Sequence, residues 1–126
     1  MRVFVADDSA RLRKQIICLL SELQGIEFVG QAQAAPEALR AVRELKPDVV
    51  TLDIQMIGGS GIDVLKQIKR GDSAPVVIVL SNSSSPPYRK SAKEAGADFF
   101  LDKSTEFDEV REIIQRLLRR FNSPRA

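Results

Sequence analysis

Residues 49–53 read VVTLD, a short run suited to a buried strand that ends in a carboxylate, and the same pattern recurs along the chain. Residues 3–8 read VFVADD and residues 76–81 read VVIVLS. Runs that are nearly all apolar are typical of parallel strands covered on both faces. Helix-period segments separate these runs, which indicates repeated strand–helix units. The predicted fold class is therefore α/β, a doubly wound, flavodoxin-like (βα)5 arrangement around a five-stranded parallel sheet.

Two further strands are expected to form the edges of this sheet. Residues 27–33 and 97–101 mix polar and apolar side chains, as edge strands do. Placing them outermost is consistent with the strand order 2-1-3-4-5, whose switch point lies between the first and third strands. The carboxyl ends of the strands then share one edge of the sheet. Five polar side chains should gather there: Asp7, Asp8, Asp53, Ser81 and Lys103.

Capping residues and helix breakers suggest where the helices begin and end. Ser9 is suited to cap a first helix, and a second helix should end at Lys46, which precedes a proline. A fourth helix is expected over residues 86–95, and it should be the most weakly packed because it has few large apolar residues. The last helix is expected to begin near Ser104 or Thr105, with a regular apolar face after it.

Composition excludes several classes of protein. A chain of 126 residues fits one domain, and a net charge of +2 gives no reason to expect nucleic-acid binding. Cys18 is the only cysteine, which excludes an internal disulfide and a cysteine-based zinc cage. No apolar stretch approaches the roughly 20 residues of a membrane span, and no signal-peptide pattern follows Met1. We therefore expect a cytoplasmic protein that does not contact a membrane.

The expected cluster combines three carboxylates, a hydroxyl and an ammonium group. Carboxylate oxygens are ligands for a hard cation, a carboxylate can act as a nucleophile, and the other two groups can hold phosphoryl oxygens. Each residue also has a simpler interpretation. Asp7 and Asp8 could favour the positive end of the first helix, Lys103 could be a surface lysine, and Ser81 could simply end a strand.

Taken together, the segments VFVADDS, VVTLDIQM, PVVIVLSN and GADFFLDKS, with Gly61 eight residues after Asp53, resemble the receiver domain of bacterial two-component response regulators. The resemblance covers almost the whole chain and is closest to a stand-alone, chemotaxis-regulator-like receiver. It implies a receiver domain over residues 1–122 and a short polar tail over residues 123–126. The order and spacing of the four segments make the resemblance specific, although each segment alone would be weak.

The resemblance implies an acidic site that accepts a phosphoryl group. Asp53 would be the nucleophile and would become an aspartyl phosphate. Asp8, Asp53 and the backbone carbonyl of Gln55 would bind one Mg²⁺, while Asp7 would act through a metal-bound water. Because grouped carboxylates repel one another, we expect metal binding and phosphoryl transfer to be coupled.

The resemblance also implies a conformational switch. Lys103 and Ser81 would hold phosphoryl oxygens, which completes a catalytic set with Asp53. Ser81 would then move toward the phosphoryl group while Phe100, on the fifth strand, rotates inward. Phenylalanine has no hydroxyl that could hold the outward state, so we expect packing alone to drive its rotation. The face made by the fourth helix, fifth strand and fifth helix would change as a result.

The phosphoryl group must come from a partner if it comes from phosphohistidine, since the chain has no histidine. The resemblance implies a histidine kinase or a histidine phosphotransfer protein as donor and an unknown downstream protein target. It implies no enzyme activity beyond catalysis of the chain's own phosphorylation and dephosphorylation. Two alternatives stay open: a phosphorylation-independent interaction module with a receiver fold, and an excised receiver of a DNA-binding transcriptional regulator.

Enzymes on similar folds fit the sequence poorly. A flavodoxin requires a phosphate-binding loop rich in Ser, Thr or Gly after the first strand, whereas this chain has ADDSA. A phosphatase of the haloacid dehalogenase type requires a second aspartate two residues after the nucleophile, where Gln55 stands.

Three positions depart from the usual receiver pattern. Ile57 and Ser104 stand where receivers usually carry proline, and Asn82 stands where a small residue is usual. We expect the bond between Lys103 and Ser104 to be trans, because cis bonds are almost confined to proline. None of these changes removes a reacting group.

Overall fold

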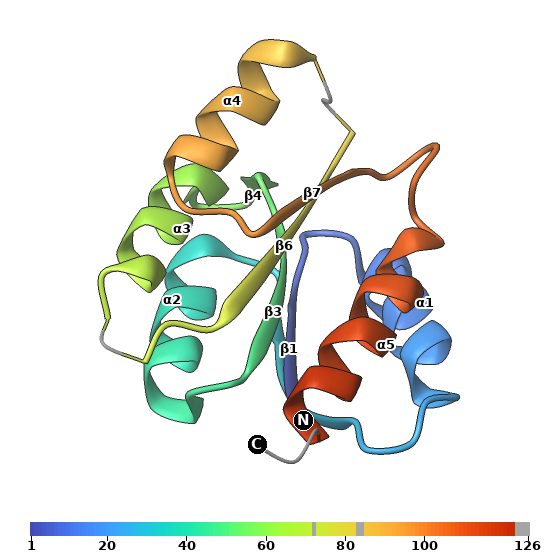
Figure 1. Ribbon diagram of the computed structural model, residues 1–126. Coiled ribbons are helices and arrows are strands. Elements are labelled where there is room, and N and C mark those ends of the chain that lie inside the picture. Colours follow the sequence, from blue (N-terminus) through green and yellow to red (C-terminus); the bar gives the residue numbers. More distant parts are fainter. Residues whose placement is uncertain (72, 83–84, 123–126) are drawn as a thin grey trace.

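The structure is a computed structural model that describes residues 1–71, 73–82 and 85–122. A five-stranded parallel sheet forms the centre of the molecule, and helices cover both of its faces (Figure 1). The strands are β1 (Arg2–Ala6), β2 (Glu27–Ala32), β3 (Val49–Asp53), β6 (Val76–Ser81) and β7 (Phe99–Asp102). Their order is β2-β1-β3-β6-β7. The predicted order 2-1-3-4-5 is confirmed, since β6 and β7 are the fourth and fifth strands of this sheet along the chain.

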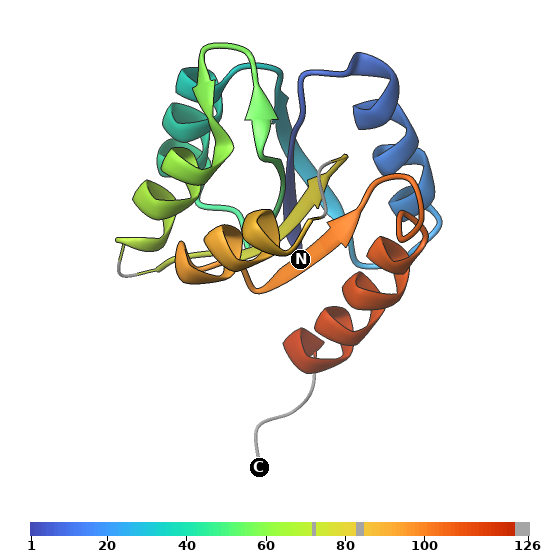
Figure 2. The same cartoon turned by 90° about the horizontal axis from the view of Figure 1, so that it is seen from above.

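The helices form two layers on opposite sides of the sheet (Figure 2). They are α1 (Ala10–Ser21), α2 (Ala35–Leu45), α3 (Gly61–Lys69), α4 (Pro86–Glu94) and α5 (Glu109–Asn122). Buried residues of α2, α3 and α4 pack into one hydrophobic cluster, and those of α1 and α5 pack into a second. Within the described part of the chain, no helix is both long enough and apolar enough to cross a membrane.

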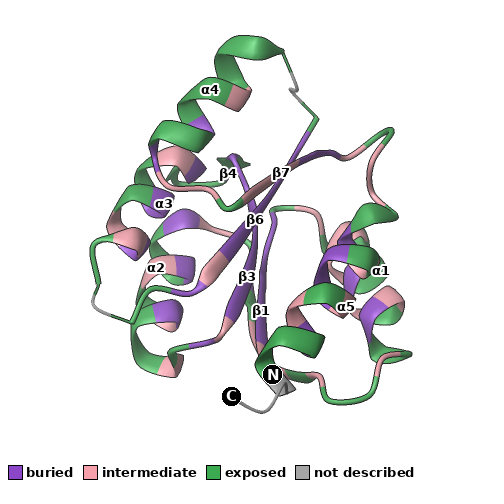
Figure 3. Cartoon of the chain, in the orientation of Figure 1, coloured by how far each residue is buried: buried purple, intermediate pink, exposed green. Residues whose placement is uncertain are grey.

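The strands supply side chains to both clusters in alternation. In β3, Val50 and Leu52 belong to the cluster under α2, α3 and α4, whereas Val49 belongs to the cluster under α1 and α5. Successive residues of a strand point to opposite faces, so a strand with two covered faces must be apolar at nearly every position. Figure 3 shows largely buried central strands between helices that carry both buried and exposed residues. This is why the uninterrupted runs in the sequence identified the central strands correctly.

Local signals position most helix ends as expected. The Ser9 side chain accepts a hydrogen bond from the Leu12 backbone N–H at 3.2 Å and so caps α1. Helix α2 ends at Lys46, whose φ of 48° lies in the left-handed region. Helix α4 buries only Ala92 among its described residues, in agreement with the prediction that it packs weakly.

The prediction for the start of the last helix is wrong. Helix α5 begins at Glu109 rather than near Ser104 or Thr105. The Asp102 carboxylate accepts hydrogen bonds from the Ser104 backbone N–H at 2.8 Å and from its hydroxyl at 2.5 Å. A carboxylate that binds the backbone two residues further on favours a turn over a helix. The chain therefore turns once more before α5, and the bond between Lys103 and Ser104 is trans, as expected.

The segment after Asp53 forms a small hairpin that sequence reasoning missed. Strands β4 (Gln55–Met56) and β5 (Gly59–Ser60) pair antiparallel, and Gly58 between them has a φ of 84°. Positive φ favours glycine, so Gly58 suits the tight turn. The Ala35 backbone N–H donates a hydrogen bond of 2.9 Å to the Ile57 carbonyl, which ties the hairpin to the start of α2.

Gly61 should be required for the close approach between this hairpin and β3. A Cβ atom at this position would overlap the Asp53 carbonyl oxygen and lie 2.5 Å from Ile54 Cα. Because backbone atoms cannot move aside cheaply, Gly61→Ala should lower the free energy of unfolding by about 2 kcal/mol or more. Chemical denaturation would measure the change. Gly71→Ala is the matched control, since its nearest contact would be the Ile68 carbonyl at 3.7 Å. Equal losses in both variants would contradict this explanation.

Candidate functional site

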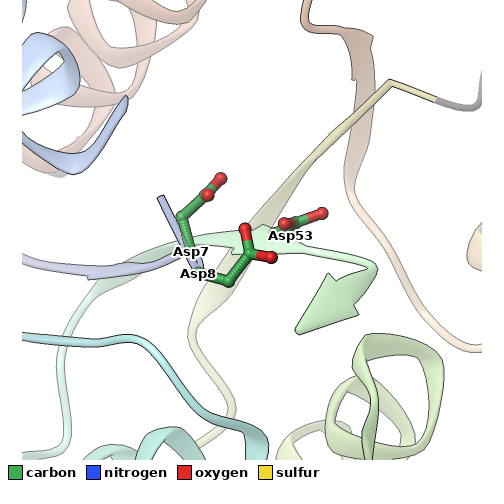
Figure 4. Close-up of side chains that lie close together, drawn as sticks. All are labelled: Asp7, Asp8 and Asp53. Atoms are coloured by element: carbon green, nitrogen blue, oxygen red, sulfur yellow. The ribbon is translucent and has the colours of Figure 1, made fainter. Parts of the chain in front are cut away.

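Three carboxylates meet at the carboxyl edge of the sheet (Figure 4). Asp53 ends β3, while Asp7 and Asp8 directly follow the neighbouring strand β1. One carboxylate oxygen from each residue lies within 4.8 Å of the others. Asp7 and Asp53 are 1% and 4% exposed, whereas Asp8 is open to solvent. The predicted gathering of these three residues is therefore present in the structure.

Lys103 joins this cluster from the far edge of the sheet. Its ammonium nitrogen lies 2.7 Å from Asp7 Oδ2 and 3.2 Å from Asp53 Oδ2. The lysine side chain is 9% exposed, so the ion pairs are shielded from solvent. Strand β6 lies between β3 and β7, which means that Lys103 reaches across the end of β6. Alternation explains this reach, because Lys103 and both aspartates fall at positions that face the α1–α5 side.

Backbone groups fix the orientation of the two buried carboxylates. Asp7 Oδ1 accepts a hydrogen bond of 2.9 Å from the Ser9 N–H, and Asp53 Oδ1 accepts one of 3.0 Å from the Gln55 N–H. The second oxygen of each carboxylate thus faces the Lys103 ammonium. In addition, Arg13 donates a hydrogen bond of 2.6 Å to the Asp7 carbonyl. Neither aspartate can turn without breaking a hydrogen bond.

Burial raises the proton affinity of both shielded carboxylates. Loss of hydration raises the pKa of Asp53 to about 6, and the negative charge of Asp7 adds to this effect. The Gln55 N–H and the Lys103 ammonium oppose it. Burial likewise raises the pKa of Asp7 despite its contact with Lys103. One ammonium group therefore does not fully compensate two buried carboxylates, and a further cation would relieve the remaining charge.

An open cleft lies over the cluster and gives small molecules access to it. Its lining includes the predicted residues Asp8, Asp53, Gln55 and Lys103, together with Asn82. Arg11 and Gln15, one turn apart on α1, also line the cleft and were missed by sequence reasoning. The sequence contained a signal for them, because residues four apart share a helix face and α1 begins at Ala10, two residues after Asp8. The exposed carboxylate of Asp8 and its buried neighbours form a set of oxygen ligands suited to a hard divalent cation.

The two residues of the expected switch fall on the other face of the sheet, away from the side that holds Lys103. Ser81 ends β6 and is 1% exposed, and its carbonyl accepts a hydrogen bond of 2.9 Å from the Lys103 N–H. Phe100 is half-buried on the neighbouring strand β7. Val77, Val79 and Phe100 contact the same hydrophobic cluster, so Ser81 also falls on that face by alternation.

Two known proteins have sequences that are similar to this chain. Response regulator GacA from Pseudomonas aeruginosa is 30% identical over 126 residues, which is 98% of this chain and 59% of that protein. A protein-glutamate methylesterase/protein-glutamine glutaminase from Methanospirillum hungatei is 40% identical over 115 residues, 90% of this chain and 34% of that protein. The chain thus spans about three fifths and one third of these curated relatives.

Solved structures and a family model agree with these relatives. The response regulator domain of Thermotoga maritima CheB matches with a TM-score of 0.81 at 31% identity and covers 95% of this chain and 94% of that one. A two-component response regulator of the LuxR family from Aurantimonas matches with a TM-score of 0.84 at 29% identity and covers 93% and 84% of the two chains. The model of the response regulator receiver domain matches residues 3–115, and the chain belongs to this family.

Proposed function

We propose that this chain is a phosphoacceptor signalling protein of a two-component or phosphorelay system, with Asp53 as the residue that is phosphorylated. The observation that supports this most is the buried Asp53 carboxylate, which lies 3.2 Å from Lys103 and among two further carboxylates. The open cleft above it gives a phosphodonor access. Asp53 attacks phosphorus, the bond from phosphorus to the donor breaks, and the leaving group takes up a proton.

Lys103 and the carboxylates have different electrostatic roles in this reaction. In the resting protein the Lys103 ammonium partly compensates the charge of the buried carboxylates, and after transfer it holds a phosphoryl oxygen. A bound Mg²⁺ ion would supply the additional positive charge that an anionic donor requires near three carboxylates. Asp8, Asp53 and the Gln55 carbonyl would hold this ion, with Asp7 outside its direct ligands. The contacts support this division, because Lys103 lies closer to Asp7 (2.7 Å) than to Asp53 (3.2 Å), and the Asp8 carboxylate is exposed to solvent.

The switch consists of Ser81 and Phe100 and changes the face made by α4, β7 and α5. Ser81 turns toward the phosphoryl group, and Phe100 takes up the space that this movement leaves. Their positions on one face of adjacent strands support this pairing. The weak packing of α4, which buries only Ala92 among its described residues, keeps the energetic cost of a change on that face low.

The donor and the target are proteins that the family implies in general terms. We propose a histidine kinase or histidine phosphotransfer protein as donor and a protein as target, with no direct contact of this chain with nucleic acid or membrane. The relatives' greater length favours one second candidate, the receiver of a longer regulator. The length of the natural open reading frame distinguishes it from a stand-alone receiver over residues 1–122.

A small phosphodonor such as acetyl phosphate should label one residue in the presence of Mg²⁺. Intact-mass analysis should show one added phosphate, because a single carboxylate lies at the nucleophile position. Asp53→Asn should abolish labelling. Asp63→Asn is the matched control, since Asp63 is an exposed aspartate in the first turn of α3 and should leave labelling unchanged. Labelling of Asp53→Asn at the wild-type level would exclude Asp53 as the acceptor.

Metal binding should depend more on Asp8 than on Asp7. Asp8→Asn removes a direct ligand and should weaken Mg²⁺ binding by at least about tenfold, whereas Asp7→Asn should have a smaller effect. Amide NMR signals near the cleft provide the readout, because the chain has no tryptophan for fluorescence. A larger loss in Asp7→Asn would exchange the two roles.

The buried carboxylate of Asp53 should make the metal-free protein less stable at neutral pH. The folded state holds the proton more tightly than the unfolded chain, since the pKa of Asp53 rises from 3.8 to about 6. Ionisation therefore lowers the free energy of unfolding as pH rises from 3.8, and the loss is complete above pH 6. Asp53→Asn should accordingly stabilise the protein by about 2 kcal/mol at pH 7 and by much less at pH 4. Urea denaturation at both values tests this, and a variant that is less stable at pH 7 would contradict it.

A further inference from the structure

A charged contact lies over the ring of Phe100. The Arg89 guanidinium carbon is 4.8 Å from the centroid of this ring, close enough for a cation–π interaction. Arg89 Nη2 also lies 2.8 Å from Glu106 Oε1. Arg89 belongs to α4, Phe100 to β7, and Glu106 to the loop between β7 and α5. The contact therefore joins α4, β7 and the loop that leads to α5, all within the face that the proposed switch changes.

Glu106 is held in place by the end of β7. The same oxygen that contacts Arg89 accepts a hydrogen bond of 3.0 Å from the Asp102 N–H. The Glu106 N–H donates in turn to the Asp102 carbonyl at 2.8 Å. The hydrogen bond from Arg89 lowers the pKa of Glu106, so the carboxylate stays charged at neutral pH. Arg89 thus meets a fixed anion rather than a side chain that moves freely in solvent.

The guanidinium group covers the outer side of the Phe100 ring. A small surface cavity beside the ring is lined by Arg89, Lys93 and Phe99 among other residues. The inner side of the ring packs against the cluster that contains Val77 and Val79. The inward rotation of the proposed switch would move the ring away from the guanidinium and end the cation–π contact. From the sequence we expected packing alone to control this ring. The contact with Arg89 is a second interaction that acts on it.

We propose that Arg89 and Glu106 form a latch that closes over Phe100 and holds the unphosphorylated state of the face made by α4, β7 and α5. This inference rests on the proposed function, because it assigns a regulatory role within the same switch. A ligand that binds the switched state must overcome every contact that favours the resting state. The latch therefore lowers the apparent affinity for a phosphoryl group and shifts the equilibrium toward the resting state.

The ion pair between Arg89 and Glu106 is weak enough to break when the switch changes state. The Arg89 and Glu106 side chains are 42% and 30% exposed, so solvent weakens their ion pair. Such a pair biases an equilibrium without locking it. Other ion pairs of the protein have different surroundings: Lys69 and Asp98 hold the start of β6, where Asp98 also accepts the Val77 N–H at 2.8 Å. Among the described residues with a cation–π contact, Arg89 alone lies over the switch aromatic.

The test is the affinity of the full chain for beryllofluoride with Mg²⁺, a mimic of the phosphoryl group, measured by NMR titration. Glu106→Gln removes the charge but keeps an oxygen that can accept the Asp102 N–H. Arg89→Gln removes the other half of the latch. Each variant should bind the mimic about threefold to tenfold more tightly, because the resting state loses its added contact. The double variant should gain no more than the larger single effect, since both changes break one interaction.

Three further measurements separate a latch from a structural ion pair. Affinity for Mg²⁺ alone should not change, since the latch lies outside the carboxylate cluster. Aromatic signals of Phe100 in the unliganded variants should shift toward their positions in the mimic-bound wild type. Lys90→Gln is the matched control: Lys90 is an exposed neighbour on α4 that contacts Glu94 only at 4.0 Å, and its loss should leave the mimic's affinity unchanged.

Two results would contradict the latch, and only the second of them would also contradict the proposed function. Unchanged affinity for the mimic in both variants, with reduced stability, would make the pair structural and leave the proposed function intact. Failure of the wild-type protein to bind the mimic at any Mg²⁺ concentration would overturn the proposed function and the latch with it.

Discussion

The contact of one buried ammonium with two buried carboxylates is the constraint on which the site depends. Lys103 lies 2.7 Å from Asp7 and 3.2 Å from Asp53, and these residues come from opposite parts of the sheet. The parallel sheet brings the carboxyl ends of β1, β3 and β7 to one edge and so brings these three groups together. Because the carboxylates are still undercompensated, their pKa values stay raised. The core therefore stabilises an arrangement of charges that is unfavourable without a ligand.

Sequence patterns correctly predicted the parts of the structure that are determined by a single physical rule, such as burial on both faces of a strand. Burial on both faces makes a strand apolar throughout, so the three central strands could be read directly, and the polar residues that follow them marked the cluster. The same reasoning placed Lys103 at the shared edge but gave no distances. Alternation, which puts Lys103 on the same face as both aspartates, became useful only once the strand ends were known.

Features set by a few local hydrogen bonds were missed. The Asp102 carboxylate competes for Ser104 and delays α5 to Glu109, although apolar periodicity suggested an earlier start. Hairpin β4–β5 has only two residues per strand, too few for a periodic signal. The contact of Arg89 with Glu106 joins residues 17 positions apart in different elements, and no periodicity relates them. Such contacts depend on tertiary structure, which is why a sequence pattern does not predict them.

The sheet separates the proposed reacting groups of this protein from the residues of the proposed switch. Asp7, Asp53 and Lys103 fall on the α1–α5 side, whereas Ser81 and Phe100 fall on the side of α4. The hydrogen bond from the Lys103 N–H to the Ser81 carbonyl joins the two sides through main-chain atoms. No side-chain atom takes part in this hydrogen bond. In a fold divided in this way, the face made by α4, β7 and α5 can diverge in sequence while the acidic cluster stays the same. Evolution can therefore combine one reaction with many different partner proteins.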